Sequence, residues 1–341
     1  MSHLTTCPQA IIISSMAKLL EPQAILKDRY RVAGPIGQGG MGAVYRAEDT
    51  LLPGRTCAVK EIAPDPDIEP EMLTQLQDQF RQEASVLARL DHPNLPKVSD
   101  YFTQNGREYL VMDFVPGHDL RELIDKAQQE NHLIEEAQVL DWADQLCSAL
   151  AYLHEQDPPI LHRDIKPSNI KLTPTGLIKL VDFGLVKLLT SDEARTVTVV
   201  QGQGTAAYTP LEQYGGDDTH TDIRSDVYSL GATLYHLLTG RSPMTARERF
   251  LRPEALVFPR SINSAISPGV EHAILLALSL HPDKRPATMT AFQTMLHQAG
   301  VPAQIAPLLL TMREWRVALR ANLPLLAIAA VLTLLALIIT P

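Results

Sequence analysis

The stretch LHRDIKPSNIKL, residues 161–172, constrains this chain more than any other part of it. It places a histidine, an arginine, an aspartate, a lysine and an asparagine within eight positions, between two apolar runs. An acid, cations and an amide at this spacing indicate a chemical role. The segments around the stretch narrow what that role is.

Composition sets the limits of the answer. With 341 residues, 45% hydrophobic and 20% charged, the chain can bury a large core, and a two-domain globular body is expected. The 30 basic and 39 acidic residues give a formal charge of −9, without a basic block, so nucleic acid is not expected as a partner. Cys7, Cys57 and Cys147 are far apart, which predicts free thiols in a reducing compartment and neither a zinc site nor a disulfide framework.

The N-terminal segment, residues 1–29, contains a short apolar patch. No basic region precedes this patch, and it is too short to cross a bilayer, so it is not expected to be a signal peptide. We expect an unstructured extension here.

The last segment, residues 321–341, carries no charge. About 20 apolar residues are needed to span a hydrocarbon layer of roughly 30 Å, so a single transmembrane helix is expected. The alternative is a buried helix of the soluble core, which would normally keep one polar face. A basic and aromatic flank in residues 299–320 favours the membrane interpretation and a cytoplasmic location for everything before it; the flanking residues are Arg313, Trp315, Arg316 and Arg320.

A glycine cluster stands at the start of the globular part. Gly37, Gly39 and Gly42 form the pattern G-x-G-x-x-G between two strand-like runs. Without side chains, such residues let backbone amides approach phosphate oxygens closely. A dinucleotide-binding fold uses the same pattern, but there the glycines open a helix, whereas the residues after Gly42 favour a strand.

A lysine, Lys60, follows on the short alternating strand CAVKEI. An unpaired lysine on an apolar strand is costly, so we expect an anionic partner. The next segment has helical spacing that places Glu83 beside an apolar stripe, and Glu83 is the expected partner. The alternative is two solvated surface charges. The stripe consists of Phe80, Ala84, Leu87 and Leu90.

Three further elements lead to and follow the opening stretch. Residues 108–115 are expected to form a buried strand, followed by a turn that links two lobes. Residues 177–186 form a strand that ends in Asp182-Phe183-Gly184. Between them, residues 135–156 predict a long amphipathic helix, with one face made of Val139, Trp142, Ala143, Leu146, Ala149 and Leu150.

Taken in order, these motifs resemble the protein-kinase superfamily. They are G-x-G-x-x-G-x-V, the A-V-K lysine, a helical glutamate, H-R-D-x-K-x-x-N and D-F-G. The sequences GQGGMGAVYRAED and AVKE are similar to those of bacterial Hanks-type serine/threonine kinases, in particular of cyanobacterial members. The resemblance covers residues 30–298 and implies an α+β, bilobal kinase fold: a small antiparallel sheet lobe with one helix over about 30–114, and a mostly helical lobe over about 115–298.

The resemblance also implies a role for each polar residue of the site. Phosphoryl transfer requires charges held in place. Asp164 would orient or deprotonate the substrate hydroxyl, Lys166 would steady the transferring group, and Asn169 and Asp182 would hold magnesium, with manganese as a substitute. The residues implied to bind ATP are Ile36, Gly37, Gly39, Gly40, Gly42, Val44, Ala58, Lys60, Glu83, Asp113 and Val115.

The segment after the D-F-G motif lies where kinases have an activation loop. The resemblance implies autophosphorylation there, in trans within a homodimer, with Thr196 and Thr198 as the expected sites and Arg163 as a partner for the phosphate. The alternative is that both threonines are solvated loop residues. Thr205 resembles the family threonine that bonds the catalytic aspartate and lysine.

Several positions are implied to be structural. His162 is expected to pack against the Asp-Phe-Gly segment, and Asp226 holds the family's structural aspartate position. Glu212 is expected to pair with Arg285 inside the helical lobe. The chain departs from the family at Leu211, where kinases have proline, and this puts peptide docking in doubt.

Three functions are considered. The first is an active kinase of protein serine and threonine, anchored to a membrane. The second is a catalytically silent kinase fold that acts as a scaffold, for which the loss of Lys60, Asp164 or Asp182 would be the sign; none is lost. The third is a dinucleotide-binding enzyme, which the strand after Gly42 disfavours.

Overall fold

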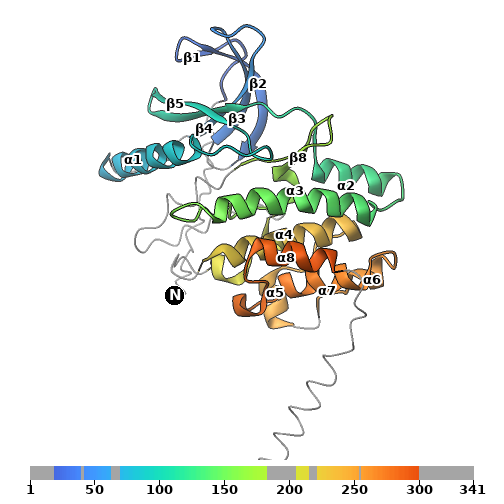
Figure 1. The fold of residues 1–341 in the computed structure, drawn as a ribbon. Coiled ribbons are helices and arrows are strands. Elements are labelled where there is room, and N and C mark those ends of the chain that lie inside the picture. Colours follow the sequence, from blue (N-terminus) through green and yellow to red (C-terminus); the bar gives the residue numbers. More distant parts are fainter. Residues whose placement is uncertain are drawn as a thin grey trace, which may run out of the picture.

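The computed structural model describes residues 19–39, 42–62, 70–182, 205–214, 221–252 and 255–298, although some side chains of residues 70–83 lie outside the description. The chain forms a sheet lobe above a helical lobe (Figure 1). This confirms the predicted bilobal α+β arrangement. Phe183, Gly184 and the segment 321–341 lie outside the described residues.

The upper lobe is a six-stranded antiparallel sheet in the order β1-β2-β3-β4-β6-β5. The two predicted strands around the glycines are observed as β2 and β3, and residues 40 and 41 of the predicted turn lie outside the described residues. The predicted strand at 108–115 is observed as β6, with buried residues along most of its length. The strands are β1 (Ile25–Leu26), β2 (Tyr30–Gly39), β3 (Gly42–Asp49), β4 (Thr56–Ile62), β5 (Val98–Gln104) and β6 (Arg107–Asp113).

One helix, α1 (Pro70–Leu87), packs against this sheet. Phe80, Ala84 and Leu87 are buried there, as the helical spacing predicts. Leu90 is also buried but lies beyond the end of the helix, so the predicted stripe continues into the connection to β5.

The expectation of an unstructured N-terminal extension is wrong for residues 19–29. Leu26 is buried, and Leu19, Leu20 and Ala24 pack against an apolar cluster of the sheet. The apolar side chains of this segment remove surface from water, which offsets the cost of ordering the chain.

The lower lobe consists of helices and a small antiparallel sheet of β7 (His118–Asp119), β8 (Ile170–Leu172) and β9 (Ile178–Leu180). The helix α4 is the centre of the lobe, because nearly all of its residues are buried. The helices are α2 (Leu120–Gln129), α3 (Glu136–His154), α4 (Ile223–Thr239), α5 (Ala246–Leu251), α6 (Pro259–Ile262), α7 (Pro268–Ala277) and α8 (Met289–His297).

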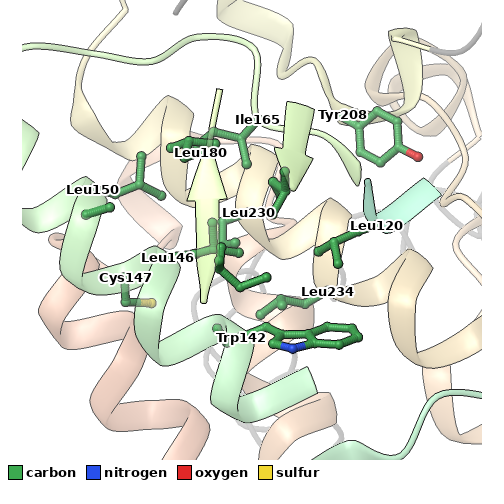
Figure 2. Packing of buried hydrophobic residues seen from close by; sticks show 14 of the residues in the cluster. Leu120, Trp142, Leu146, Cys147, Leu150, Ile165, Leu180, Tyr208, Leu230 and Leu234 are labelled. Atoms are coloured by element: carbon green, nitrogen blue, oxygen red, sulfur yellow. The ribbon is translucent and has the colours of Figure 1, made fainter. Parts of the chain in front are cut away.

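The core of the helical lobe anchors the segments that carry the polar motifs (Figure 2). Ile165, inside the opening stretch, and Leu180, two residues before Asp182, are both fully buried in it. The predicted apolar face of α3 is confirmed, since all six of its residues are buried. The polar side chains between these anchors are therefore held on a rigid support.

No helix within the described residues is long and apolar enough to cross a membrane. Cys57 and Cys147 are buried free thiols, as predicted, and Cys7 lies outside the described residues.

Candidate active site

The loop that contains the opening stretch is held by Asp226, near the start of α4. The Asp226 carboxylate accepts hydrogen bonds from the backbone N–H of His162 and of Arg163, each at 2.9 Å, and from His154 Nε2 at 2.9 Å. Arg163 has a φ of 63°, a left-handed conformation that costs about 1–3 kcal/mol in a non-glycine residue. The hydrogen bonds to the fully buried Asp226 hold Arg163 in this conformation. Burial opposes its ionisation, but the bonds from His154 and the loop lower its pKa below the ordinary value.

His162 is structural, as predicted. It is fully buried, and its Nε2 donates to the carbonyl oxygen of Val181 at 3.2 Å, one residue before Asp182. Burial lowers the pKa of the imidazole, so it stays neutral at neutral pH. His154 was not predicted from the sequence. The only signal for it was a polar residue at the end of the apolar α3.

Asp164, Lys166 and Asn169 come together at one carboxylate oxygen. Lys166 Nζ and Asn169 Nδ2 each donate to Asp164 Oδ2 at 2.9 Å. Asn169 Nδ2 also donates to the Asp164 carbonyl oxygen at 2.9 Å, which closes the loop on itself. Among the described residues no hydrogen bond to Asp164 Oδ1 is observed, so this oxygen can accept a bond from another molecule.

Lys60 and Asp182 join the two lobes. Lys60 Nζ, from β4, lies 2.8 Å from Asp182 Oδ1, which follows β9. Burial opposes ionisation of Asp182, but the Lys60 charge and hydrogen bond lower its pKa. The predicted partner Glu83 lies in α1, and its side chain is outside the described residues, so that pair stays a prediction. The Lys60–Asp182 contact was not predicted from the sequence, because 122 residues separate the two positions.

Glycines lie at the end of β2 and the start of β3, and β3 pairs with the strand that carries Lys60. Gly39 pairs with Gly42, and Val44 pairs directly with Lys60 on the neighbouring strand. A Cβ at Gly42 would lie 1.9 Å from the Glu61 carbonyl oxygen, so this close approach of β3 to β4 requires glycine. Gly40 lies outside the described residues.

The remaining positions expected to bind nucleotide are in the sheet and at the lobe connection. Ile36 is exposed on β2, whereas Ala58 is buried on β4 opposite Met112. Asp113 ends β6, and Val115 follows two residues later in the connection between lobes.

The side-chain oxygens of Asn169 and Asp182 suit a hard metal ion that takes its remaining ligands from a second molecule. Both observed bonds of the Asn169 amide use its nitrogen, which leaves its oxygen for a ligand. The Val181 N–H donates to the Asn169 carbonyl oxygen at 2.9 Å. This bond holds Asp182, the residue after Val181, close to Asn169. Within the described ranges there is no cluster of three or more acidic, histidine or cysteine ligands. Magnesium is usually held by one or two carboxylates together with phosphate oxygens and water, so the two residues fit it.

Thr205, in the segment after the D-F-G motif, contacts the loop that carries Asp164. Lys166 Nζ donates to Thr205 Oγ1 at 3.2 Å, which bears out part of the expectation for Thr205. Thr196 and Thr198 lie outside the described residues.

The predicted Glu212–Arg285 pair is confirmed. The guanidinium donates to the two carboxylate oxygens of Glu212 at 2.6 and 3.0 Å, and the Arg285 side chain is fully buried. Leu211 precedes Glu212 in a short 3-10 turn, so the leucine is compatible with this anchor.

Comparison with known proteins gives a consistent family. A family model described as "Protein kinase domain" matches residues 30–297. A probable serine/threonine-protein kinase of Streptomyces coelicolor is 36% identical over 277 residues, which are 78% of this chain and 39% of that protein. The serine/threonine-protein kinase B of Synechocystis sp. is 35% identical over 228 residues, 64% of this chain and 38% of that protein.

The chain thus spans less than half the length of these curated relatives. Identity to the Streptomyces and Synechocystis proteins is similar, so the cyanobacterial affinity stays a prediction. Among solved structures, PpkA-294 in its apo form superimposes with a TM-score of 0.69 at 28% identity, covering 82% of this chain and all of that one. Since the family model extends over most of the 341 residues and the fold is bilobal, the chain belongs to the protein kinase family.

Proposed function

We propose that this chain is a serine/threonine protein kinase that transfers the γ-phosphoryl group of ATP to protein hydroxyls. The observation that carries the proposal is the contact of Lys60 in the sheet lobe with Asp182 in the helical lobe, next to the loop of Asp164. The similar proteins are named serine/threonine-protein kinases, which supports the same class of acceptor. A lysine at position 166 is also typical of the serine/threonine class of protein kinases.

The catalytic loop supplies groups for both reactants. Asp164 Oδ1 would accept the hydrogen bond of the substrate hydroxyl and then its proton, while Oδ2 stays fixed by Lys166 and Asn169. Lys166 is close enough to the same carboxylate to balance negative charge on the group in transfer. Such fixed charges act without reorganisation during the reaction, which is where a kinase gains most of its rate.

Nucleotide binding would use the sheet lobe. The glycine turn would place backbone amides over the phosphates, and Lys60 would contact the phosphates before the one that is transferred. Asn169 and Asp182 would hold magnesium, which when bound neutralises phosphate charge. Asp182 is suited to this because its lowered pKa keeps it ionised at neutral pH.

Regulation and location belong to the same proposal. Thr196 and Thr198 would be phosphorylated in trans by a second copy, and Arg163 in the catalytic loop would bind the phosphate. The charge-free segment 321–341 would anchor the chain in a membrane, with the basic flank and the kinase body on the cytoplasmic side.

The test is phosphate incorporation from γ-labelled Mg-ATP by the 341-residue chain, purified in detergent, with phosphosites mapped. The wild type is compared with Asp164→Asn, and with Asp283→Asn as a matched change at a largely exposed aspartate. We expect label on Thr196 or Thr198 in the wild type and in the Asp283 variant, and at least a thousandfold less in Asp164→Asn. Nucleotide binding without incorporation in any of the three proteins would refute the kinase and favour the scaffold.

A further inference from the structure

The N-terminal strap, defined as residues 19–26, covers the outer face of the sheet. Its backbone is bonded to β2, with Gln23 N–H donating to Val32 O and Val32 N–H donating to Ala24 O, both at 2.8 Å. Leu19, Leu20 and Ala24 pack against one apolar cluster. The cluster is Leu26, Tyr30, Val32, Ala43, Tyr45, Ala47, Cys57, Val59, Phe102, Tyr109 and Val111.

A buried carboxylate, Glu61, lies at this face. Its side chain is 3% exposed. Glu61 Oε2 accepts a hydrogen bond from Tyr45 Oη on β3 at 2.7 Å, and Oε1 accepts from Arg107 Nη1 at 2.5 Å and from Tyr109 Oη at 3.2 Å, both on β6. The side chain of Glu61 therefore ties β4 to both of its neighbouring strands, in addition to the backbone ladder.

The strap is bonded directly to this network. The Leu20 backbone N–H donates to Tyr45 Oη at 3.1 Å, and Tyr45 Oη in turn donates to Glu61. Burial raises the pKa of Tyr45 to about 12, so the phenol keeps the proton that it donates. The link from strap to β4 is thus intact throughout the neutral range of pH.

Glu61 adjoins Lys60 in β4, and successive side chains of a strand point to opposite faces. Lys60 accordingly lies on the other face of the sheet, where it meets Asp182. A shift of β4 at the outer face must therefore move the lysine. A displacement near 1 Å in a charged site is enough to lose much of its binding and catalysis.

We propose that the N-terminal strap is a positioning element of the nucleotide site, which acts on Lys60 through Tyr45 and Glu61. The inference rests on the proposed function, because it takes Lys60 as a nucleotide contact. Glu61 is a positioning residue and touches no substrate. Any partner that lifts the strap from the sheet would weaken nucleotide binding without occupying the site.

The experiment measures Mg-ADP dissociation constants of the full chain by calorimetry. A strap variant, Leu19→Ser with Leu20→Ser, is compared with a control of the same chemistry at two exposed leucines of the sheet lobe, Leu51→Ser with Leu52→Ser. Tyr45→Phe removes the phenol that links the strap to Glu61. We expect the strap variant and Tyr45→Phe each to weaken binding about fivefold, which is roughly 1 kcal/mol at 1.4 kcal/mol per tenfold change, and the control to stay within twofold.

Combination of the variants tests the route. If the strap acts through Tyr45, the strap variant combined with Tyr45→Phe should bind no more weakly than either alone. Tyr109→Phe removes a second bond of the same Glu61 network, so its effect should likewise be less than additive with that of the strap variant. Backbone amides of β4 should exchange hydrogen faster in the strap variant than in the control.

The outcomes separate the two proposals. A lower melting temperature in the strap variant, with Mg-ADP affinity within twofold of the wild type, would show that the strap only covers the core and would overturn the inference. A wild type that binds Mg-ADP but transfers no phosphate refutes the proposed function and leaves this test valid. A wild type that binds no nucleotide overturns both.

Discussion

The buried pair Glu212–Arg285 provides the sharpest prediction about stability. Replacing Glu212 by glutamine keeps the shape of the side chain but leaves the Arg285 guanidinium buried without its counter-charge. Arg285 is held in place by further bonds to the carbonyl oxygens of Ser279, Arg224 and Leu280, so it cannot turn toward solvent. Breaking a buried pair by removal of one partner costs about 3–5 kcal/mol.

The assay is thermal unfolding of the full chain followed by circular dichroism. For a body of this size each kcal/mol shifts the melting temperature by about 2–4 °C, so Glu212→Gln should lower it by roughly 6–20 °C. The control is Asp283→Asn, which breaks the pair of Arg224 with an aspartate whose side chain is 71% exposed. Exposed pairs contribute about 0.2–1 kcal/mol, so the control should shift the melting temperature by about 4 °C or less.

The pH dependence has a definite sign. Burial opposes ionisation of Glu212, but the bonds from Arg285 and Ser225 lower its pKa below the ordinary value of 4.5. A carboxyl group with a lowered pKa stabilises the folded state above its unfolded pKa, and the contribution is lost as pH falls through the folded pKa. The difference between wild type and Glu212→Gln should therefore be full at pH 7 and shrink below about pH 4.5. Equal shifts for Glu212→Gln and Asp283→Asn at pH 7 would refute the reasoning.

Three other changes test the fold and the site. Gly42→Ala should destabilise the sheet lobe by about 1–3 kcal/mol and weaken ATP binding, because its Cβ would meet a backbone oxygen of β4 at 1.9 Å. The matched control is Gly37→Ala, whose Cβ would have its nearest contact at 3.9 Å and which should shift the melting temperature little. Asp226→Asn leaves one of two buried loop N–H groups without an acceptor, so it should cost about 1–3 kcal/mol in urea unfolding and lower kcat at least tenfold; unchanged kcat would contradict the anchoring role. A chain ended after residue 298 should keep its helical signal and kinase activity, but one ended after residue 287 should not fold, because it loses the buried face of α8; equal expression and melting of the two truncations would contradict this.

Most of the sheet lobe and the main helices could be predicted from local patterns. The alternation in CAVKEI and the 3.6-residue period of α3 each lie within one element, where neighbouring side chains determine the conformation. Residues 19–29 were misjudged because their apolar side chains are few and irregular. Their order depends on a sheet face that only the folded chain provides.

The candidate site was identified as a set of residues, but its contacts were not all predicted. Glu212 and Arg285 were paired correctly because both belong to family motifs. The bond of Lys60 to Asp182, the three bonds to Asp226 and the network around Glu61 were missed, because each joins residues whose separation in the sequence has no periodic signal.

The sequence by itself determined which chemical groups are present and which elements carry them: a lysine on a strand, an acid and an amide in a loop, and glycines in a turn. Tertiary structure decided which of these groups meet, through strand register and the packing of α4 beneath the loop. The physical reason is that local conformation follows from interactions between near neighbours in the sequence. The contact of Lys60 with Asp182 instead joins residues far apart in the sequence, and it forms only when each lobe has packed its own core.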